Sequence, residues 1–394
     1  MHICLIARHY PPEASGGARR PYLFTQALRD AGHRVTIVSP FRQAHPDHIV
    51  VPHLVSSDYD RDKGEPSAEE PQPDPTEQSP LRNIARNWLL WPEPEIRWAR
   101  RVARHLESHP IRADWLMTTS PPESLHIVGP RIKAALGCRW LAEFRDTWTV
   151  NPHRAVLARS GLRRSIERTM AQRCLRTVDA LTAVSEAVLS EIRAYAPDGT
   201  PEHIIDHFSD PPPAPKDLPK SDLNIVHSGG FTLSDRRRKL DTLLTRLDHL
   251  SARRTGCPLH LHIAGQLSLE EKTLLARREE ANEPPTKVTA YGALPLAEAR
   301  ALQAGADALL LLTPEDSHAL PGKFAEYRQT RLPILYQGGG DWLSLIDAPD
   351  ALQPLDLALL SIRKGDRVPE DCPPGLNAAA AAQSLTDFLG HLTP

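Results

Sequence analysis

A short apolar run followed by a turn and a short helix is the feature that most limits how this chain can fold. The run, Ala308 to Leu312, holds one alanine and four leucines, which is typical of a strand buried on both faces of a parallel sheet. Pro321-Gly322 then opens a helix that carries Lys323 and Glu326, and Pro333 to Tyr336 predict the next strand. Because α/β proteins bind phosphates beyond the carboxyl ends of parallel strands, we expect a ligand site here.

The two polar side chains of this helix have the chemistry of a nucleotide site. Lys323 can neutralise a phosphate, and the carboxylate of Glu326, one turn further along, can accept hydrogen bonds from a ribose diol. The pattern therefore predicts a sugar-nucleotide site. A capped surface helix without a ligand is the alternative.

The composition favours a two-domain protein that is soluble or peripheral. A chain of 394 residues is too long for one ordinary core. A formal net charge of −2 gives no general attraction to nucleic acid. The five cysteines are scattered, so we expect reduced thiols in a cytoplasmic protein. The chain enters a strand at Ile3 without a charged leader, and no apolar run reaches the ~20 residues that span a bilayer.

Strands and helices alternate in two stretches of the chain, which predicts two parallel-sheet domains. The first stretch opens with a strand, a helix from about Arg20 to Ala31 and a second strand, all within residues 2–39. The second opens with a strand over Asn224 to Ser228, and it continues with strands over Leu259 to Ala264 and Val288 to Tyr291 without a predicted helix between these two. The predicted divisions are a first domain over 1–205, a proline-rich linker over 206–220, a second domain over 221–375 and a final helix over 376–394. Residues 58–80 are acidic and proline-rich, which predicts a mobile insertion.

The helix motif Pro321-Gly322-Lys323 with Glu326 and Tyr327 resembles the donor helix of the retaining glycosyltransferases of family 4, in a bacterial branch that reads Pro-Gly-Lys-x-x-Glu-Tyr. This resemblance implies the GT-B fold, with two Rossmann-like domains that face a central cleft and a last helix that returns to the first domain. In the wider family two glutamates flank seven residues. Here the second is Glu326, while His318 takes the first position, so we expect the sugar contact to differ.

The resemblance also implies a set of donor contacts in the second domain. A basic pair, Arg238 and Lys239, is expected to stabilise the diphosphate, with Arg236 as a substitute; a solvated charged face is the alternative. The turn at Tyr291 is expected to present backbone groups to the base, unless it is a plain turn between strand and helix. The remaining expected donor contacts are Gly229, Gly230, Gly265, Leu320 and Gly322.

In the first domain, two loops are candidates for ligand contact. Gly16-Gly17 lies in the first loop after a strand, where glycine allows the backbone to approach a ligand closely; an ordinary turn is the alternative. The resemblance implies that this loop lies beside the donor diphosphate and the acceptor. Arg145 and Asp146 follow an apolar strand, and the resemblance implies that one of them faces the transferred sugar. A buried ion pair between Arg145 and Asp146 is the alternative.

Several other patterns argue against further chemistry. His260 and His262 share one face of a strand, which indicates packing more than metal binding, and His203 with His207 falls at a strand end. No paired catalytic carboxylates stand out. We therefore expect no metal and no cofactor besides the nucleotide-sugar substrate.

The segment over residues 82–104 is rich in tryptophan and arginine, which suits contact with a membrane surface. The side chains in question are Trp88, Trp91, Arg97, Arg100, Arg101 and Arg104. The alternative is a domain helix that packs its tryptophans inward.

The resulting prediction is a retaining, metal-independent hexosyltransferase that moves a sugar from a UDP- or GDP-sugar to an acceptor hydroxyl. The acceptor would be a saccharide, a lipid-linked saccharide or a small molecule, in surface polysaccharide or glycoconjugate synthesis. The residues expected to carry catalysis are Arg145, Asp146, Arg238, Lys239 and His318. The alternatives are a GT-B sugar-nucleotide epimerase and a catalytically decayed nucleotide-sugar-binding protein. The expected location is the cytoplasm or the inner face of the cell membrane.

Overall fold

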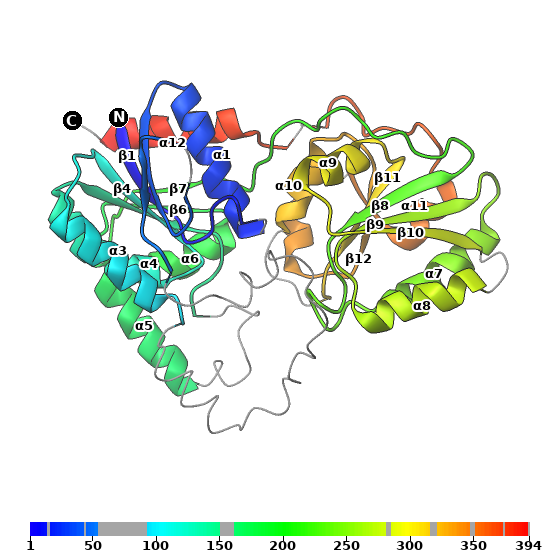
Figure 1. Cartoon of the computed structure of the whole chain (residues 1–394), viewed down its shortest axis with the longest axis horizontal. Helices are drawn as coiled ribbons and strands as arrows, with labels where there is room; N and C mark the ends of the chain where they lie inside the picture. Colours follow the sequence, from blue (N-terminus) through cyan, green and yellow to red (C-terminus); the bar gives the residue numbers. More distant parts are fainter. Residues whose placement is uncertain are drawn as a thin grey trace. The chain divides into compact units, whose positions relative to one another are not determined.

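The computed structural model describes residues 1–13, 16–42, 45–53, 93–149, 161–280, 285–315, 321–346, 351–372 and 375–392. The chain divides into two compact units, one of Met1–Asp206 with Ala379–Pro394 and one of His207–Ala378 (Figure 1). We call these unit 1 and unit 2. The predicted insertion over 58–80, His318 and Leu320 lie outside the described residues.

Unit 1 is built on a seven-stranded parallel sheet in the order β3-β2-β1-β4-β5-β6-β7. Its strands are β1 (His2–Ile6), β2 (Arg34–Ser39), β3 (His48–Val50), β4 (Trp115–Ser120), β5 (Arg139–Phe144), β6 (Ala180–Ala183) and β7 (Glu202–Ile204). Its helices are α1 (Gly16–Asp30), α3 (Ile96–Ser108), α4 (Ser124–Leu136), α5 (Gly161–Leu175), α6 (Glu186–Arg193) and α12 (Ala378–Leu392). The predicted Rossmann-like architecture is confirmed for this unit.

Helix α3 shows why an amphipathic sequence packs against this sheet. Its buried residues recur with helical spacing and join the core between the sheet and α4. Trp98 is 1 % exposed, and its indole Nε1 donates a hydrogen bond to the carbonyl of Val51 at 2.7 Å. Arg97, Arg100 and Arg104 point outward. Trp98 thus packs inward, as the domain-helix alternative predicts. Trp88 and Trp91 lie outside the described residues, so membrane contact by this segment stays a prediction.

Unit 2 has a six-stranded parallel sheet in the order β10-β9-β8-β11-β12-β13. Its strands are β8 (Leu223–Ser228), β9 (Leu259–Ala264), β10 (Thr286–Gly292), β11 (Ala308–Leu312), β12 (Ile334–Gln337) and β13 (Leu352–Pro354). Its helices are α7 (Leu240–Arg253), α8 (Leu269–Glu280), α9 (Leu296–Ala304), α10 (Gly322–Arg328), α11 (Leu355–Ser361) and the 3₁₀ helix η3 (Asp341–Leu345). Helices α7 and α11 cover one face, and α9 and α10 cover the other (Figure 1).

The predicted linker packs on unit 2 along part of its length. The backbone N–H of Lys216 donates to the carbonyl of Ala301 in α9 at 2.8 Å, and its ammonium lies 4.7 Å from the centre of the Tyr291 ring. Leu218 joins the core beside α9. The proline-rich segment forms no helix or strand, yet Lys216 and Leu218 hold this part of it against unit 2.

Two further observations concern the whole of the described chain. Among the described residues, no helix is both long and apolar enough to cross a bilayer. All five cysteines are unpaired, with Cys4, Cys174 and Cys372 buried.

Candidate functional site

Two of the predicted donor segments, the glycine pair after β8 and the helix that carries Lys323, meet at the carboxyl ends of β8 and β11. Gly229, directly after β8, has φ +134°, a backbone conformation that strongly favours glycine. A Cβ atom at this position would clash with the ammonium of Lys323, which comes from α10. Gly229 is therefore required twice, for its backbone angle and because it lets the lysine ammonium reach the end of β8.

Buried aromatic side chains fix the short helix α10. Phe324 and Tyr327 are fully buried, and the Tyr327 hydroxyl accepts a hydrogen bond from the backbone N–H of Ser228 at 3.1 Å. This anchoring leaves Lys323 and Glu326 half-buried at the strand ends. Burial lowers the pKa of Lys323 to about 8, and the charge of Arg238 acts in the same direction, while Glu326 opposes them.

A glutamine that the sequence did not reveal holds the carboxylate of Glu326. The amide Nε2 of Gln303, on α9, donates to Glu326 Oε1 at 2.7 Å and to Ser228 Oγ at 2.8 Å. Gln303 is only 2 % exposed. The signal that could have found it is a lone amide in a helix otherwise built of alanine, leucine and surface charges.

The basic cluster after β8 sends one arginine inward. Arg238 is half-buried, and its Nε atom is buried with no hydrogen-bond partner in the part of the chain that the structure describes. Arg236 and Lys239 are exposed, and Arg237 is exposed and pairs with Asp235 at 3.0 Å. The solvated-face alternative thus fits part of the cluster. Arg238 is the member of the cluster that turns inward, and ligand contact by Arg238, Lys239 or Arg236 stays a prediction.

A small pocket of about 120 Å³ lies beside Arg238, between the start of α7 and the ends of β11 and β12. Its lining consists of Arg237, Arg238, Lys239, Thr242, Leu243, Leu312, Thr313, Pro314 and Gln337. Thr313 Oγ1 and Gln337 Oε1 are buried and have no partner among the described residues. Buried polar atoms without partners commonly mark the place of a ligand or water. The pocket therefore offers positive charge and unused hydrogen-bonding groups together.

The other predicted donor glycines have packing reasons of their own. A Cβ at Gly265 would clash with the carbonyl of Gly229, so Gly265 is needed where the loops after β8 and β9 touch. A Cβ at Gly230 would lie 2.7 Å from Ser234 Oγ, whereas Gly322 has His207 as its nearest neighbour at 3.7 Å. Their contact with a donor stays a prediction.

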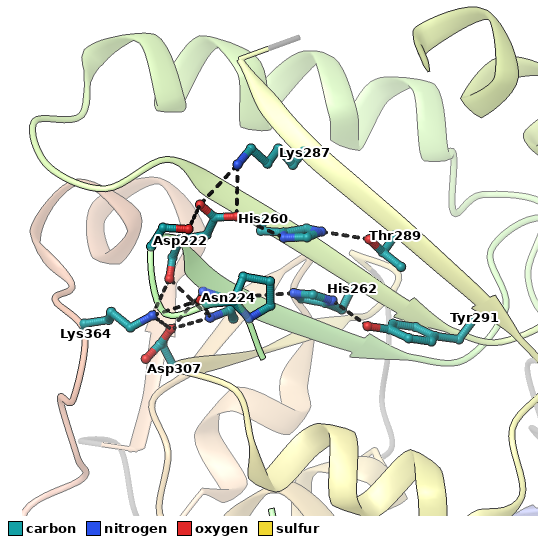
Figure 2. Close-up of polar contacts among 11 residues, drawn as sticks. Asp222, Asn224, His260, His262, Lys287, Thr289, Tyr291, Asp307 and Lys364 are labelled. Carbon is teal, nitrogen blue, oxygen red and sulfur yellow. Dashed lines mark hydrogen bonds and ion pairs between the residues drawn. The ribbon is translucent and has the colours of Figure 1, made fainter. Parts of the chain in front are cut away.

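The side chain of Tyr291 points toward His262 on β9 (Figure 2). Its hydroxyl lies 3.0 Å from His262 Nδ1 on β9, and His262 Nε2 lies 3.0 Å from Asn224 Oδ1 on β8. Asn224 Nδ2 donates to the oxygens of Pro219, Asp222 and Asp307, so Asn224 Oδ1 must accept from His262. His262 is neutral because burial lowers its pKa to about 4, so Tyr291 donates to it. Only the backbone of Tyr291 is left for the predicted base contact.

The same network shows what the side chains of His260 and His262 contact. His260 packs on His262 with ring centres 4.0 Å apart, and it bonds Asp222 at 3.2 Å and Thr289 at 2.8 Å. Lys287 also bonds Asp222, at 3.1 Å. No cluster of three or more metal-ligating side chains occurs in the described ranges. The histidines belong to a structural network on the face of the sheet that α9 and α10 cover, as the packing interpretation predicted.

In unit 1, Arg145 binds the chain's own loops. Its guanidinium donates to the carbonyls of Ser120 at 2.8 Å, Gly17 at 2.7 Å and Pro121 at 3.0 Å. Arg145 is 8 % exposed. These three hydrogen bonds go to carbonyls and not to Asp146, and a sugar contact by Arg145 or Asp146 stays a prediction. Arg145 ties the loops after β4 and β5 to the first turn of α1, which already begins at Gly16 and not at the predicted Arg20.

A buried carboxyl pair in unit 1 also escaped the sequence analysis. Glu123, before α4, is 3 % exposed, and Glu93 hydrogen-bonds with it and accepts from the backbone N–H of Ser124 at 2.7 Å. Burial, followed by the proximity of Glu123, raises the pKa of Glu93 well above its ordinary value. Thirty residues separate the two carboxyls, so spacing along the sequence could not show the pair.

The comparisons with known proteins agree with this architecture. Residues 15–206 match the family model described as a glycosyl transferase 4-like domain, which covers unit 1 from α1 onward. A comparison with curated protein sequences gave no match.

Similar solved structures span both units. HepE from Anabaena, solved with UDP and glucose, has a TM-score of 0.62 at 11% identity and covers 99% of this chain and 100% of its own. Sucrose-phosphate synthase from Thermosynechococcus elongatus has a TM-score of 0.57 at 15% identity, over 99% and 90%. UDP-GlcNAc 2-epimerase from Methanocaldococcus jannaschii has a TM-score of 0.57 at 9% identity, over 99% and 100%. The chain therefore has the GT-B fold, and residues 15–206 are similar to a glycosyl transferase 4-like domain.

Proposed function

We propose that this chain is a glycosyltransferase that takes its sugar from a nucleotide diphosphate sugar bound to unit 2. One observation carries the proposal: the ammonium of Lys323 fills the place of a Cβ atom at Gly229. A lysine ammonium, an inward arginine and an oriented carboxylate then surround the end of β8. Cations suit a diphosphate, and the carboxylate suits a ribose diol.

The charges of this site suit the departure of a nucleotide diphosphate. The positive charges of Lys323 and Arg238 both lower the pKa of His227. Arg238 also lowers the pKa of Lys323, and the carboxylate of Glu326 opposes this effect. Fixed positive charge stabilises the negative charge that develops on the leaving phosphate as the glycosidic bond breaks. Lys323 and Arg238 would supply that charge. This electrostatic role is our reason for proposing a transferase that needs no metal.

The finer features are proposals on the same basis. The Pro-Gly-Lys-x-x-Glu-Tyr motif supports a retaining transfer of a hexose, and the two nucleotides to test first are UDP and GDP. HepE, which is similar in fold, was solved with UDP and glucose, which favours UDP as the first trial. We propose an acceptor hydroxyl on a saccharide, lipid-linked saccharide or small molecule. Surface polysaccharide or glycoconjugate synthesis, in the cytoplasm or at the inner membrane face, is the proposed setting.

A donor screen read out by nucleotide release tests the proposed activity. The purified protein is incubated with UDP- and GDP-sugars and a mixture of saccharide acceptors. We expect release of one nucleotide, and a severe loss of release in Glu326→Gln, because the amide cannot accept from both ribose hydroxyls in the same way. Glu280→Gln, an exposed glutamate on α8, is the matched control. Equal release by wild type and Glu326→Gln would contradict the assigned donor site.

A sugar-nucleotide epimerase is the second candidate, because the fold is similar to that of UDP-GlcNAc 2-epimerase. Incubation with the donor alone separates the two functions. An epimerised nucleotide sugar formed without acceptor would replace the transferase proposal, whereas an unchanged donor supports it.

A further inference from the structure

The imidazole of His227, the fifth residue of β8, is buried beside the donor site and has one ring nitrogen without a partner. His227 is 1 % exposed, and its Nδ1 lies 3.0 Å from the carbonyl oxygen of Leu310. A carbonyl only accepts, so Nδ1 carries the hydrogen and the neutral ring leaves Nε2 as an acceptor. Nε2 is buried and has no hydrogen-bond partner in the described part of the chain. Native proteins rarely leave such an atom unused.

The free nitrogen of His227 faces the same point as the ammonium of Lys323. A Cβ built on Gly229 would lie 3.7 Å from His227 Nε2 and would also clash with Lys323 Nζ. The glycine thus leaves open the space that separates the acceptor from the ammonium. The ammonium has three N–H donors and the imidazole nitrogen has one lone pair, so the two groups are complementary.

Burial, together with the neighbouring positive charges, keeps His227 neutral. Burial lowers its pKa to about 3, and Lys323 and Arg238 act in the same direction. Tyr327, Glu326 and Arg238 are the other titratable groups around Lys323 and the end of β8. Because His227 stays uncharged near neutral pH, it can accept a hydrogen bond without adding to the positive charge of the site.

We propose that His227 is a positioning residue of the donor site. Its Nε2 accepts a hydrogen bond from one water that in turn accepts from the Lys323 ammonium, and this directs the remaining N–H groups of the lysine toward the diphosphate. The inference rests on the proposed nucleotide-sugar site. On this proposal His227, which lies outside the Pro-Gly-Lys-x-x-Glu-Tyr motif, orients Lys323 of that motif.

A double-mutant cycle with UDP and GDP tests this role. His227→Phe keeps an aromatic ring beside Phe231, whose ring centre is 5.0 Å away, but removes the acceptor. We expect nucleotide affinity to fall about tenfold in His227→Phe, the usual size for a hydrogen bond to a charged group. In the Lys323→Ala background the same change should have less than about a twofold effect. Equal effects of His227→Phe in both backgrounds would overturn the proposal.

Two further measurements separate positioning from packing. The loss of affinity with rising pH should begin at lower pH in His227→Phe, because the ammonium loses an acceptor that favours its charged form; an unmoved profile indicates packing alone and contradicts us. Glutamine can place an oxygen near the position of Nε2, so His227→Gln should recover part of the affinity. No recovery relative to His227→Phe would count against the acceptor role.

Nitrogen-15 spectra of the histidines test the contact without nucleotide and without a variant at His227. We expect an unprotonated Nε2 resonance for His227 that shifts in Lys323→Ala. A protonated Nε2, or a resonance that Lys323→Ala leaves unchanged, would overturn the inference. If the wild-type protein binds neither UDP nor GDP, the proposed function fails, but these spectra still decide whether His227 and Lys323 interact.

Discussion

The amide of Gln303 donates a hydrogen bond to the carboxylate of Glu326 at 2.7 Å, and the same amide nitrogen reaches Ser228 Oγ at 2.8 Å. One buried glutamine on α9 thus links the carboxylate expected to bind ribose to the end of β8. A carboxylate that is held before the ligand arrives loses less freedom on binding. The proposed donor site of unit 2 is therefore preorganised by contacts between three separate segments: the end of β8, α9 and α10.

Replacement of Gln303 should weaken nucleotide binding without removing it. Gln303→Leu leaves Glu326 in place but loses the hydrogen bond that orients it, so we expect about a 5–10-fold lower affinity for the bound nucleotide. Calorimetry with UDP and GDP measures the change. Gln383→Leu on α12, where the glutamine is exposed and bonds Asp387, should leave affinity unchanged. Equal affinities of Gln303→Leu and wild type would show that Gln303 has no such role.

Nucleotide affinity should fall as the pH rises through about 8. Burial holds the pKa of Lys323 at about 8, so the lysine is charged below this pH and neutral above it. An anion binds the charged form, hence affinity decreases on the alkaline side. Lys323→Arg stays charged over the whole range and should flatten the profile between about pH 7 and 9.5, even if its affinity is lower. A flat wild-type profile would contradict this prediction.

A methyl group at Gly229 should harm both stability and binding. Gly229→Ala meets a strained backbone angle of +134° and displaces the Lys323 ammonium. We expect a loss of about 1–3 kcal/mol in the free energy of unfolding, together with the loss of nucleotide binding. Gly256→Ala is the matched control, because its φ is +122° and no heavy atom lies within 4 Å of its Cβ position. That variant should lose stability alone, and similar binding in both variants would disprove the steric argument.

Arg145 should matter for the stability of unit 1 and not for nucleotide binding to unit 2. Arg145→Lys cannot donate to three separate carbonyls, so we expect unit 1 to lose about 2–4 kcal/mol of stability. Chemical denaturation and UDP or GDP calorimetry measure the two effects separately. An unchanged unfolding curve with lost turnover would instead support the original prediction of a sugar contact.

The pair of Glu93 and Glu123 should make unit 1 less stable as the pH rises. Burial raises the pKa of Glu93 above its ordinary 4.5, so the folded state holds a proton that the unfolded state releases. Stability conferred by this proton is present at low pH and is lost as the pH rises above about 4.5 toward the folded-state pKa. Glu93→Gln, which is always uncharged, should reduce that loss. The measurement is the change in denaturation midpoint between pH 5 and pH 8. An equal change in Glu93→Gln and in wild type would argue against a proton held by this carboxyl pair.

The sequence allowed the strands and the donor helix to be predicted because their signals are local. The apolar run of β11 and the Pro-Gly-Lys turn of α10 need no distant partner to be recognised. Helix α8 was missed, since only Glu271 among its residues is buried and it has no continuous apolar face. The start of α1 was misplaced because Gly16-Gly17, poor helix formers, lie in its first turn.

Residues whose role depends on a distant partner could not be predicted. His227 lies 96 residues from Lys323 and Gln303 lies 23 residues from Glu326, so spacing along the sequence could not show either relationship. Arg145 looked like a ligand contact because a charged side chain after a strand has that chemistry, yet its three partners are backbone carbonyls. The long-range hydrogen bonds that decide these roles appear only once the chain is folded.

Calorimetry of UDP and GDP binding to wild-type protein, Lys323→Ala and Lys272→Ala tests the central claim most directly. Lys272 is an exposed lysine on α8 and serves as the control. We predict that wild type and Lys272→Ala bind one of the two nucleotides with equal affinity and that Lys323→Ala binds it far more weakly, though still measurably. Binding of neither nucleotide by the wild type, or equal binding by Lys323→Ala, would contradict the assignment of unit 2 as the donor site.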